Sequence, residues 1–375
     1  MFETFELASL QQYWWLIIAL LGAVLVMLLF VQGGQTLLWQ VGKTEDERRM
    51  VLNSIGRKWD LTFTTLVTFG GAFFASFPLF YATSFSGAYW AWTTLLFSFI
   101  VQAVSYEFRS KAGNWLGAKT FETFLLINGT LAPILVGTVV ASFFSGSQFS
   151  IDTYNLPEWH NAARGLELLM SGFNISLGLA VFFLSRILGA QYLSNNINDE
   201  NIRLRCRATQ RLDAGLFLLF FLSFLGMLLL RDGYAVDSMG HISLVPYKYF
   251  INLMQMPVVL IMFLAGVVLV LWGIYQSLFV KSVKSIWFTS GGTLLAVFSL
   301  FMLAAFNGTA YYPSSYDLQS SLTIYNSSSS HYTLVAMSYV SLAVPFVAAY
   351  IWIVWRSMDA KKLDLDEVRS GEELY

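Results

Sequence analysis

Residues 53–87 read NSIGRKWDLTFTTLVTFGGAFFASFPLFYATSFSG. The pattern of a basic segment followed by a long apolar run recurs along the chain. Two cations, Arg57 and Lys58, precede Trp59 and Asp60, and an uncharged run follows them. A membrane-spanning helix needs about 20 apolar residues, so the stretch predicts one span. The Trp59 ring suits the boundary between membrane and water, which places Asp60 at the mouth of the helix beside the two cations.

The composition indicates an integral membrane protein with several spans. Of the 375 residues, 56% are hydrophobic and only 12% are charged, whereas soluble domains carry about 25% charged residues. The mean hydropathy is +0.60. The net charge of −1 does not imply a nucleic-acid partner. The single cysteine, Cys206, excludes an internal disulfide and a metal site built from several thiolates.

Nine apolar stretches are long enough to cross a membrane. They are Tyr13–Leu38, Leu61–Thr83, Ala88–Tyr106, Phe121–Phe144, Leu166–Ser185, Leu212–Leu230, Met254–Phe279, Ile286–Phe306 and Tyr332–Trp355. We therefore predict an all-α membrane protein with nine transmembrane helices in a single integral membrane domain. Two loops that both run from acidic to basic residues suggest two related halves. Residues 1–145 and 146–307 would form two four-helix bundles, and residues 308–375 an outer loop, a ninth helix and a cytoplasmic tail.

The distribution of cations predicts the orientation. Of the 22 lysines and arginines, 19 fall in the odd-numbered connections or the C-terminal tail. Only Arg164, Arg231 and Lys248 fall in the even-numbered connections. Because cytoplasmic loops carry an excess of cations, we expect the C-terminus in the cytoplasm and the N-terminus outside. In the first loop, Thr44 and Glu47 fit a capping box that begins a short helix.

The histidines do not suggest a haem site in this chain. His160, His241 and His331 all fall in or beside expected outer loops, whereas a buried haem takes axial ligands from packed helices. Methionines within the spans are interpreted as packing residues. We predict no haem ligand, no metal site and no other cofactor site in this chain.

The acids cluster at the ends of the predicted spans, not in the middle where ion-coupled transporters usually carry a charge. Asp60 and Glu107 fall at the same cytoplasmic end of two neighbouring helices. Two carboxylates there could collect protons and pass them inward, with Gln102 and water continuing the path. Alternatively, each acid forms an ion pair with a nearby cation, and the two roles are compatible. Asn128 and Asn174 lie within spans, where an amide either bonds across helices or faces a cavity.

Five short runs, taken together, resemble subunit II of the cytochrome bd-type quinol oxidases. Each run alone is weak, but their order along a nine-span chain is specific. They are Thr44-Glu45-Asp46-Glu47-Arg48-Arg49; Asn53-Ser54-Ile55 with Trp59-Asp60; Gly70-Gly71-Ala72-Phe73-Phe74-Ala75 with Pro78, Tyr81 and Phe85-Ser86-Gly87; Tyr106-Glu107-Phe108-Arg109-Ser110-Lys111; and Tyr312-Pro313-Ser314-Ser315 with Ser321-Leu322-Thr323-Ile324.

The resemblance implies a complex in the bacterial cytoplasmic (inner) membrane that oxidises membrane quinol and reduces dioxygen to water. Haems b and d would belong to the haem-bearing subunit I, which this haem-free chain would support. In the family, the acid after the tryptophan of helix two belongs to a proton route from the cytoplasm. That position is Asp60 here, and the acid of the Arg-Ser-Lys motif is Glu107, with Trp59, Gln102 and Arg109 nearby. The resemblance is also compatible with a structural quinone or lipid bound to this chain and with a small single-helix accessory subunit in the complex.

The chain departs from the family pattern late in its first helix. Where well-known members carry acids, this chain has Gln32-Gly33-Gly34-Gln35-Thr36-Leu37, and Gln102 stands where an arginine is expected. The resemblance therefore does not extend to a proton path through the first helix. Two other functions stay open from the residues alone. One is a multipass small-molecule transporter, and the other is an assembly scaffold in which both acids are only ion-paired.

Overall fold

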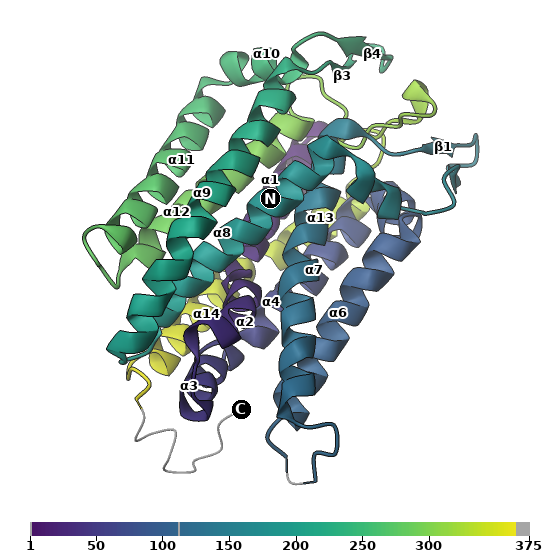
Figure 1. Ribbon diagram of the computed structural model, residues 1–375. Helices are drawn as coiled ribbons and strands as arrows, with labels where there is room; N and C mark the ends of the chain where they lie inside the picture. The colour runs from purple at the N-terminus through teal and green to yellow at the C-terminus, as the bar shows by residue number, and fades with distance from the viewer. Residues whose placement is uncertain (1, 112, 365–375) are drawn as a thin grey trace.

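The computed structural model describes residues 2–111 and 113–364, and these form a bundle of long helices (Figure 1). The helices are α1 (Leu7–Leu28), α2 (Phe30–Val41), α3 (Glu45–Gly56), α4 (Trp59–Ser76), α5 (Pro78–Phe80), α6 (Tyr89–Phe108), α7 (Ala118–Ser145), α8 (Gly172–Asn196), α9 (Glu200–Leu230), α10 (Lys248–Gln255), α11 (Pro257–Leu278), α12 (Ser285–Ala305), α13 (His331–Ser341) and α14 (Val344–Met358). Four short helical segments are η1 (Phe2–Thr4), η2 (Tyr81–Ser86), η3 (Leu166–Met170) and η4 (Leu318–Ser320). The C-terminal part of the predicted tail, residues 365–375, lies outside the described residues.

The two ends of the bundle differ in structure and charge. One end carries two antiparallel hairpins, β1 (Phe149–Ile151) with β2 (Pro157–Trp159) and β3 (Gly233–Val236) with β4 (Ile242–Val245). We call it the strand end. The opposite end holds α3, the α6–α7 connection, the α8–α9 turn and the end of α14 (Figure 1), and we call it the basic end. The capping box that begins α3 is confirmed, because Thr44 Oγ1 accepts from Glu47 N and the Glu47 carboxylate accepts from Thr44 N.

Seven helices of the described residues are long and apolar enough to cross a membrane, or eight if one bent pair counts as a span. The helix α6 covers the third predicted stretch with 20 residues, but its Trp, Tyr, Thr, Ser and Gln side chains lower its apolarity and it is not among the seven. Nine spans, the division into two bundles and the orientation stay predictions. The predicted spans are mainly helical, with short breaks such as those at Phe77 and Ser171.

The second predicted span is broken at Phe77. The chain bends by 119° between the helical stretch Glu45–Ser76, which ends with α4, and the segment Pro78–Ser86. Proline lacks a backbone donor and disfavours helical geometry in the residue before it, and Phe77 has φ −132° and ψ 65°. The segment after the bend turns back onto α6, where the Phe85 and Trp92 rings stack with centroids 3.8 Å apart. The chain therefore passes from α4 to α6 through a short kinked segment.

The connection expected between the fifth and sixth predicted spans, residues 186–211, is wrong as a loop, because most of it is helix. The helix α8 continues to Asn196 and α9 begins at Glu200, so only residues 197–199 connect them. Asp199 accepts from Ile202 N at 2.9 Å and caps α9, and Glu200 complements the positive end of the helix dipole. The helix therefore begins well before its apolar run. Because α8 continues past the end of the predicted span at Ser185, Arg186 lies inside α8 and not in a loop.

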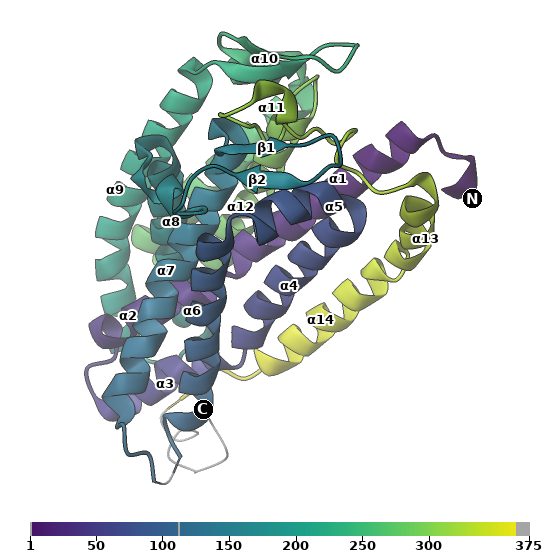
Figure 2. The ribbon, with the colours of Figure 1, turned by 90° about the vertical axis from the view of Figure 1, so that its right-hand side faces the viewer.

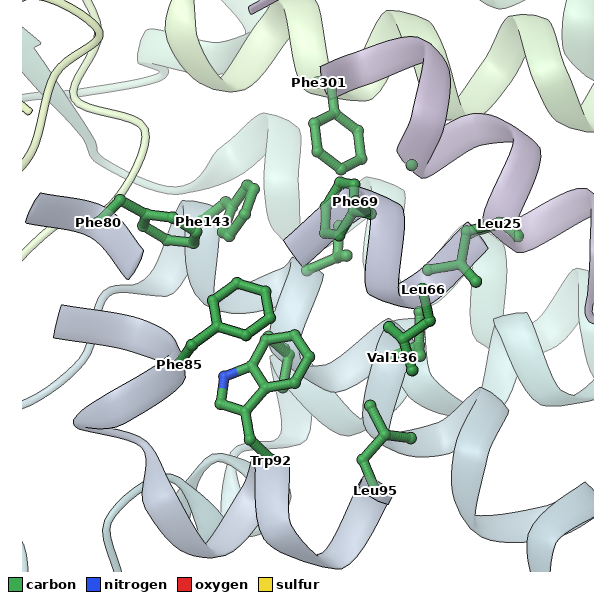
Figure 3. A pocket seen from close by; sticks show the side chains of 14 residues that line it. Leu25, Leu66, Phe69, Phe80, Phe85, Trp92, Leu95, Val136, Phe143 and Phe301 are labelled. Carbon is green, nitrogen blue, oxygen red and sulfur yellow. The ribbon is translucent and has the colours of Figure 1, made fainter. Parts of the chain in front are cut away.

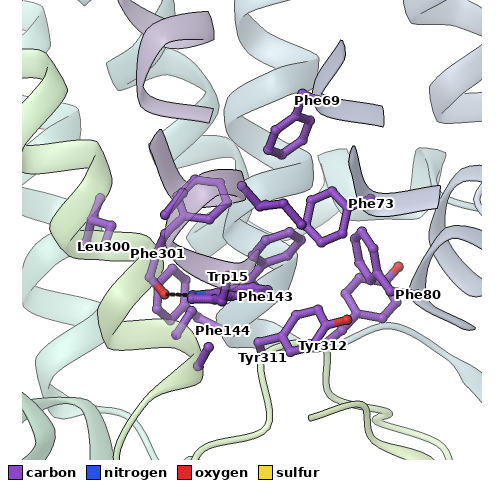
Figure 4. Close-up of a cluster of buried hydrophobic side chains, with 14 of the residues drawn as sticks. Trp15, Phe69, Phe73, Phe80, Phe143, Phe144, Leu300, Phe301, Tyr311 and Tyr312 are labelled. Carbon is purple, nitrogen blue, oxygen red and sulfur yellow. Dashed lines mark hydrogen bonds between the residues drawn. The ribbon is translucent and has the colours of Figure 1, made fainter. Parts of the chain in front are cut away.

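An aromatic core forms near the strand end around Trp15 (Figure 4). The Trp15 ring lies 4.4 Å from the Tyr311 ring, centroid to centroid, and its Nε1 donates to the Phe301 carbonyl at 3.0 Å. Toward the basic end, α2 packs against α7 and α8 at very short range. A Cβ on Gly33 would overlap the carbonyl oxygen of Ser185, so only glycine fits there. The helices α1 and α2 therefore run through the centre of the bundle.

Candidate functional site

Asp60 and Glu107, the two acids expected at a proton entrance, lie on neighbouring helix ends at the basic end. Asp60 is exposed in the first turn of α4, and Glu107 is exposed in the last turn of α6. The rings of Trp59 and Tyr106 stack with centroids 6.0 Å apart, and each acid directly follows one of these rings in the chain. The stacked pair therefore ties the two helix ends together and holds both carboxylates on the same rim.

The cations near these acids are divided among other partners. Glu107 Oε1 lies 3.3 Å from Lys111 Nζ, in an exposed pair one helical turn apart. Arg109 instead turns inward and places Nη2 2.6 Å from Glu122 Oε1. Lys58 is buried and binds Asp359 at 3.0 Å. One of the expected ion pairs therefore forms, while Arg109 and Lys58 neutralise carboxylates that the sequence did not single out.

An ion cluster joins α2, α3, α6 and α7 near these acids; its Arg109 and Glu122 side chains are buried, whereas Glu45 is 43% exposed. Arg109 Nη2 also lies 2.7 Å from Glu45 Oε1, and Arg48 Nη2 lies 2.8 Å from Glu45 Oε2. Trp39 Nε1 donates to Glu122 Oε2 at 2.6 Å. Burial alone would raise the pKa of the Glu45 carboxyl, but the hydrogen bonds from Arg48 and Arg109 outweigh it and lower that pKa. The cluster therefore favours the ionised form of the Glu45 carboxyl.

A chain of buried polar groups runs from Tyr106 into the bundle between α2, α6 and α7. We call it the amide ladder, and it consists of Tyr106, Gln35, Gln32, Gln102, Asn128 and Ser98. Gln35 Nε2 donates to the Tyr106 hydroxyl at 3.2 Å. Gln32 Nε2 lies 3.4 Å from Gln102 Oε1 and 3.5 Å from Asn128 Oδ1, and Asn128 Nδ2 donates to Ser98 Oγ at 3.2 Å. Gln102 is thus a buried member of the amide ladder and lies deeper in the bundle than the two exposed acids, Asp60 and Glu107.

The amide ladder is incompletely paired by protein groups. Among the described residues, Gln32 Oε1, Gln35 Oε1 and Gln102 Nε2 are buried without a hydrogen-bond partner. Buried amide atoms are normally satisfied, by protein or by ordered water. The ladder therefore keeps unused hydrogen-bond donors and acceptors, which a fully paired ladder would not.

A second buried ion pair was missed by sequence reasoning. Arg186 Nε lies 2.9 Å from Asp213 Oδ1, and its other nitrogens donate to Thr36 Oγ1 and Gln40 Oε1, each at 2.9 Å. These contacts join α8 and α9 to α2. The signal that could have found the pair is Asp213 itself, because a carboxylate at the start of an apolar helix needs a cation at the same depth.

None of the three histidines is buried among the helices. His160 stacks on Tyr316 with centroids 3.7 Å apart, His241 is exposed beyond β3, and His331 Nε2 bonds the Phe5 carbonyl at 2.9 Å. Where α4, α6 and α7 meet, the space is filled by aliphatic and aromatic side chains, and a cavity of only ≈ 20 Å³ remains (Figure 3). Within the described ranges, no group of three or more His, Cys, Asp or Glu is placed to hold a metal ion.

Comparisons with known proteins give the family. The family model described as cytochrome bd terminal oxidase subunit II matches residues 10–358. The chain is 29% identical to cytochrome bd-I ubiquinol oxidase subunit 2 of Escherichia coli (strain K12), over 98% of each chain. It is 26% identical to cytochrome bd ubiquinol oxidase subunit 2 of Bacillus subtilis (strain 168), over 92% of this chain and 95% of that one.

The fold is also similar to that of a solved structure. A chain of the bd oxidase from Geobacillus thermodenitrificans superposes with a TM-score of 0.58, covering 92% of this chain and 97% of that one at 10% identity. That likeness concerns the fold alone, and the family rests on the sequence matches. The chain therefore belongs to the family of cytochrome bd terminal oxidase subunit II, and it is a subunit of a quinol-oxidising oxidoreductase complex of the membrane.

Proposed function

We propose that this chain is the haem-free subunit of a bd-type terminal oxidase that oxidises membrane quinol and reduces dioxygen to water. The family match from residue 10 to residue 358 carries this proposal. Haems b and d are assigned to subunit I, and the position of the three histidines outside the helix interior supports that assignment. The family match leaves the alternative of a small-molecule transporter without support.

In this proposal the chain crosses the bacterial inner membrane nine times, with the basic end in the cytoplasm. The charge distribution supports this orientation. Arg164, Arg231 and Lys248 lie at the strand end, and the other described cations lie toward the basic end. Bound quinone or lipid and a small accessory subunit belong to the same proposal. Subunit I, quinol and lipid are the expected partners.

We place subunit I against the face that α4 presents to the outside. Asp60, Thr64 and Thr68 are exposed at spacings of four residues, so they lie along one face of α4. A carboxylate followed by hydroxyls suits a face covered by protein better than one covered by acyl chains. Val67 and Phe74 are also exposed on α4, whereas the exposed faces of α9 and α11 carry aliphatic residues such as Leu219 and Ile261. This arrangement would put Asp60 beside the subunit that consumes protons.

The proposed proton route begins at Asp60 and Glu107 and continues through the amide ladder. The Trp59–Tyr106 stack connects the acids to the first rung, because the Tyr106 hydroxyl accepts from Gln35. Glutamine side chains do not ionise, so the ladder would carry protons only along ordered water that its spare amide atoms hold. The acids supply the ionisable groups at the mouth, and the ladder supplies the polar lining.

Asp60→Asn is expected to slow oxygen reduction about tenfold, which corresponds to ~1.4 kcal/mol of barrier. The physical reason is the loss of an ionisable group at the mouth of the route, while the amide keeps the hydrogen bond from Thr64 Oγ1 at 3.4 Å. The measurement is the quinol-driven oxygen consumption rate of the purified complex, per haem.

Glu200→Gln is the matched control, because Glu200 is an exposed acid at the same end that lies on α9, away from the ladder. It should leave the rate unchanged. Full turnover of an Asp60→Asn, Glu107→Gln double variant with normal haem content would contradict the proton route and favour the assembly scaffold.

A further inference from the structure

The helix α14 is held at both ends but stands away from the bundle between them. None of its 15 residues, all of which the structure describes, is buried. At one end the preceding helix α13 packs on α1 and α4. At the other end the Trp355 ring contacts the Phe30 ring, with centroids 5.5 Å apart, and Asp359 pairs with buried Lys58 at 3.0 Å. Figure 2 shows α14 leaning outward beside α4.

The space behind α14 is a cavity of ≈ 550 Å³. Its walls come from α1, α4, α8, α12 and α14 and are mainly apolar, with Leu28, Ile286, Trp287 and Trp352 among them. The polar groups Tyr192, Asn195 and Asp359 lie toward the basic end. A cavity of this size and lining is in the range of ligand sites. In a membrane, such a space is filled by hydrocarbon, because neither water nor a void is stable between apolar walls.

The volume and the charge at the mouth identify the occupant. If a methylene group takes roughly the ~30 Å³ of a liquid water molecule, the cavity holds roughly 18 of them, which is one long acyl chain. Arg356, Lys361 and Lys362 are exposed at and just beyond the end of α14. Cations at this level attract an anionic headgroup phosphate, whereas the head of a quinone carries no charge for them to bind.

We infer that this cavity, the α14 cavity, binds one acyl chain of an anionic phospholipid whose phosphate lies at Arg356, Lys361 and Lys362. The lipid would fill the space that keeps α14 off the bundle and would act as a structural spacer. Because the Lys58–Asp359 pair closes the same end of α14, the lipid would also support the start of α4, directly before Trp59 and Asp60. The inference needs membrane insertion but not the proton route, so either can fail alone.

The variant Gly291→Leu tests the site, because Gly291 lines the cavity and a Cβ there would meet no atom within 4 Å. The leucine would occupy the cavity without displacing the helix backbone. The intact oxidase complex would be purified from its own membranes, and its bound lipids counted by native mass spectrometry and identified after extraction. We expect the wild-type complex to retain an anionic phospholipid that Gly291→Leu loses.

Gly226→Leu is the matched control, because Gly226 is an exposed glycine of α9 whose Cβ would likewise meet no atom within 4 Å. It should retain the lipid. Ala348→Phe fills the cavity from the α14 side and repeats the test if Gly291→Leu assembles poorly, as judged by haem content. An Arg356→Gln, Lys361→Gln, Lys362→Gln variant should lose its preference for anionic over zwitterionic lipid. The inference is overturned if both cavity-filling variants retain the lipid, or if the molecule they lose is a quinone.

Discussion

Arg109→Met is expected to destabilise the complex by about 3–5 kcal/mol, the usual cost of breaking a buried ion pair by removing one partner. The guanidinium is buried and binds Glu122 at 2.6 Å and Glu45 at 2.7 Å. Methionine has a similar length but removes the nearer cation of the buried Glu122 carboxylate. Among the described cations, this carboxylate is left with only Arg48, whose Nε lies 3.6 Å from Glu122 Oε1. Because Glu122 and Arg109 lie on α7 and α6, the loss should loosen the contact between these helices. The thermal midpoint of the purified complex measures the effect.

Lys111→Met is the matched control for Arg109→Met. Lys111 lies two residues further on, and its pair with Glu107 is exposed on both sides, at 62% and 59%. Exposed pairs contribute about 0–1 kcal/mol, so this variant should leave the midpoint almost unchanged. The double variant Arg109→Met, Glu122→Leu removes both buried charges and should recover part of the loss. Equal effects of Arg109→Met and Lys111→Met would contradict the buried cluster.

Arg186→Met is expected to have a comparable effect, again about 3–5 kcal/mol. The residue binds Asp213 on α9 and two side chains of α2, Thr36 and Gln40, each at 2.9 Å. Its loss would leave the buried Asp213 carboxyl without its cation where α2, α8 and α9 meet. The yield of haem-containing complex and its thermal midpoint should both fall, because α2 also carries the amide ladder.

The control for Arg186→Met is Arg211→Met, since Arg211 is an exposed arginine of α9 two residues before Asp213. We expect the control to behave like the wild-type complex. Adding Asp213→Asn to Arg186→Met removes the orphan carboxylate and should restore part of the stability. No recovery in this double variant would mean that Arg186 acts mainly through Thr36 and Gln40.

Much of the fold follows from apolar runs and local capping signals. The runs place the helices, and Thr44 with Glu47 begins α3 as the capping box predicts. The boundary between α8 and α9 could not be placed this way, because both helices continue through charged residues after their apolar runs end. Asp199 and Glu200 stabilise the start of α9 by capping and by the helix dipole, and neither effect appears in a hydropathy pattern. The break at Phe77, directly before Pro78, likewise does not appear in a hydropathy pattern, because the run around it is uncharged.

The site was predictable where partners are close in sequence. Glu107 and Lys111 are one helical turn apart, and their pair forms as the sequence suggests. Asn128 and Asn174 bond across helices, to Ser98 and Ser145, which is one of the two outcomes expected for amides within spans. The partners of Arg109 and Lys58 are set by tertiary packing instead, because Glu122 and Asp359 come from other helices. The amide ladder could not be predicted, because it depends on the register between α2, α6 and α7. Hydrophobic periodicity in the sequence does not determine that register.

The central claim is that this chain is the haem-free member of an oxidase complex, and a reduced-minus-oxidised visible spectrum tests it most directly. The chain would be purified with whatever binds it, and then alone. We expect haem bands that co-purify with a second subunit, whose histidines ligate the haem, and that are absent when this chain is purified alone. Haem bands that stay with the isolated chain, or a stable complex without haem, would contradict it.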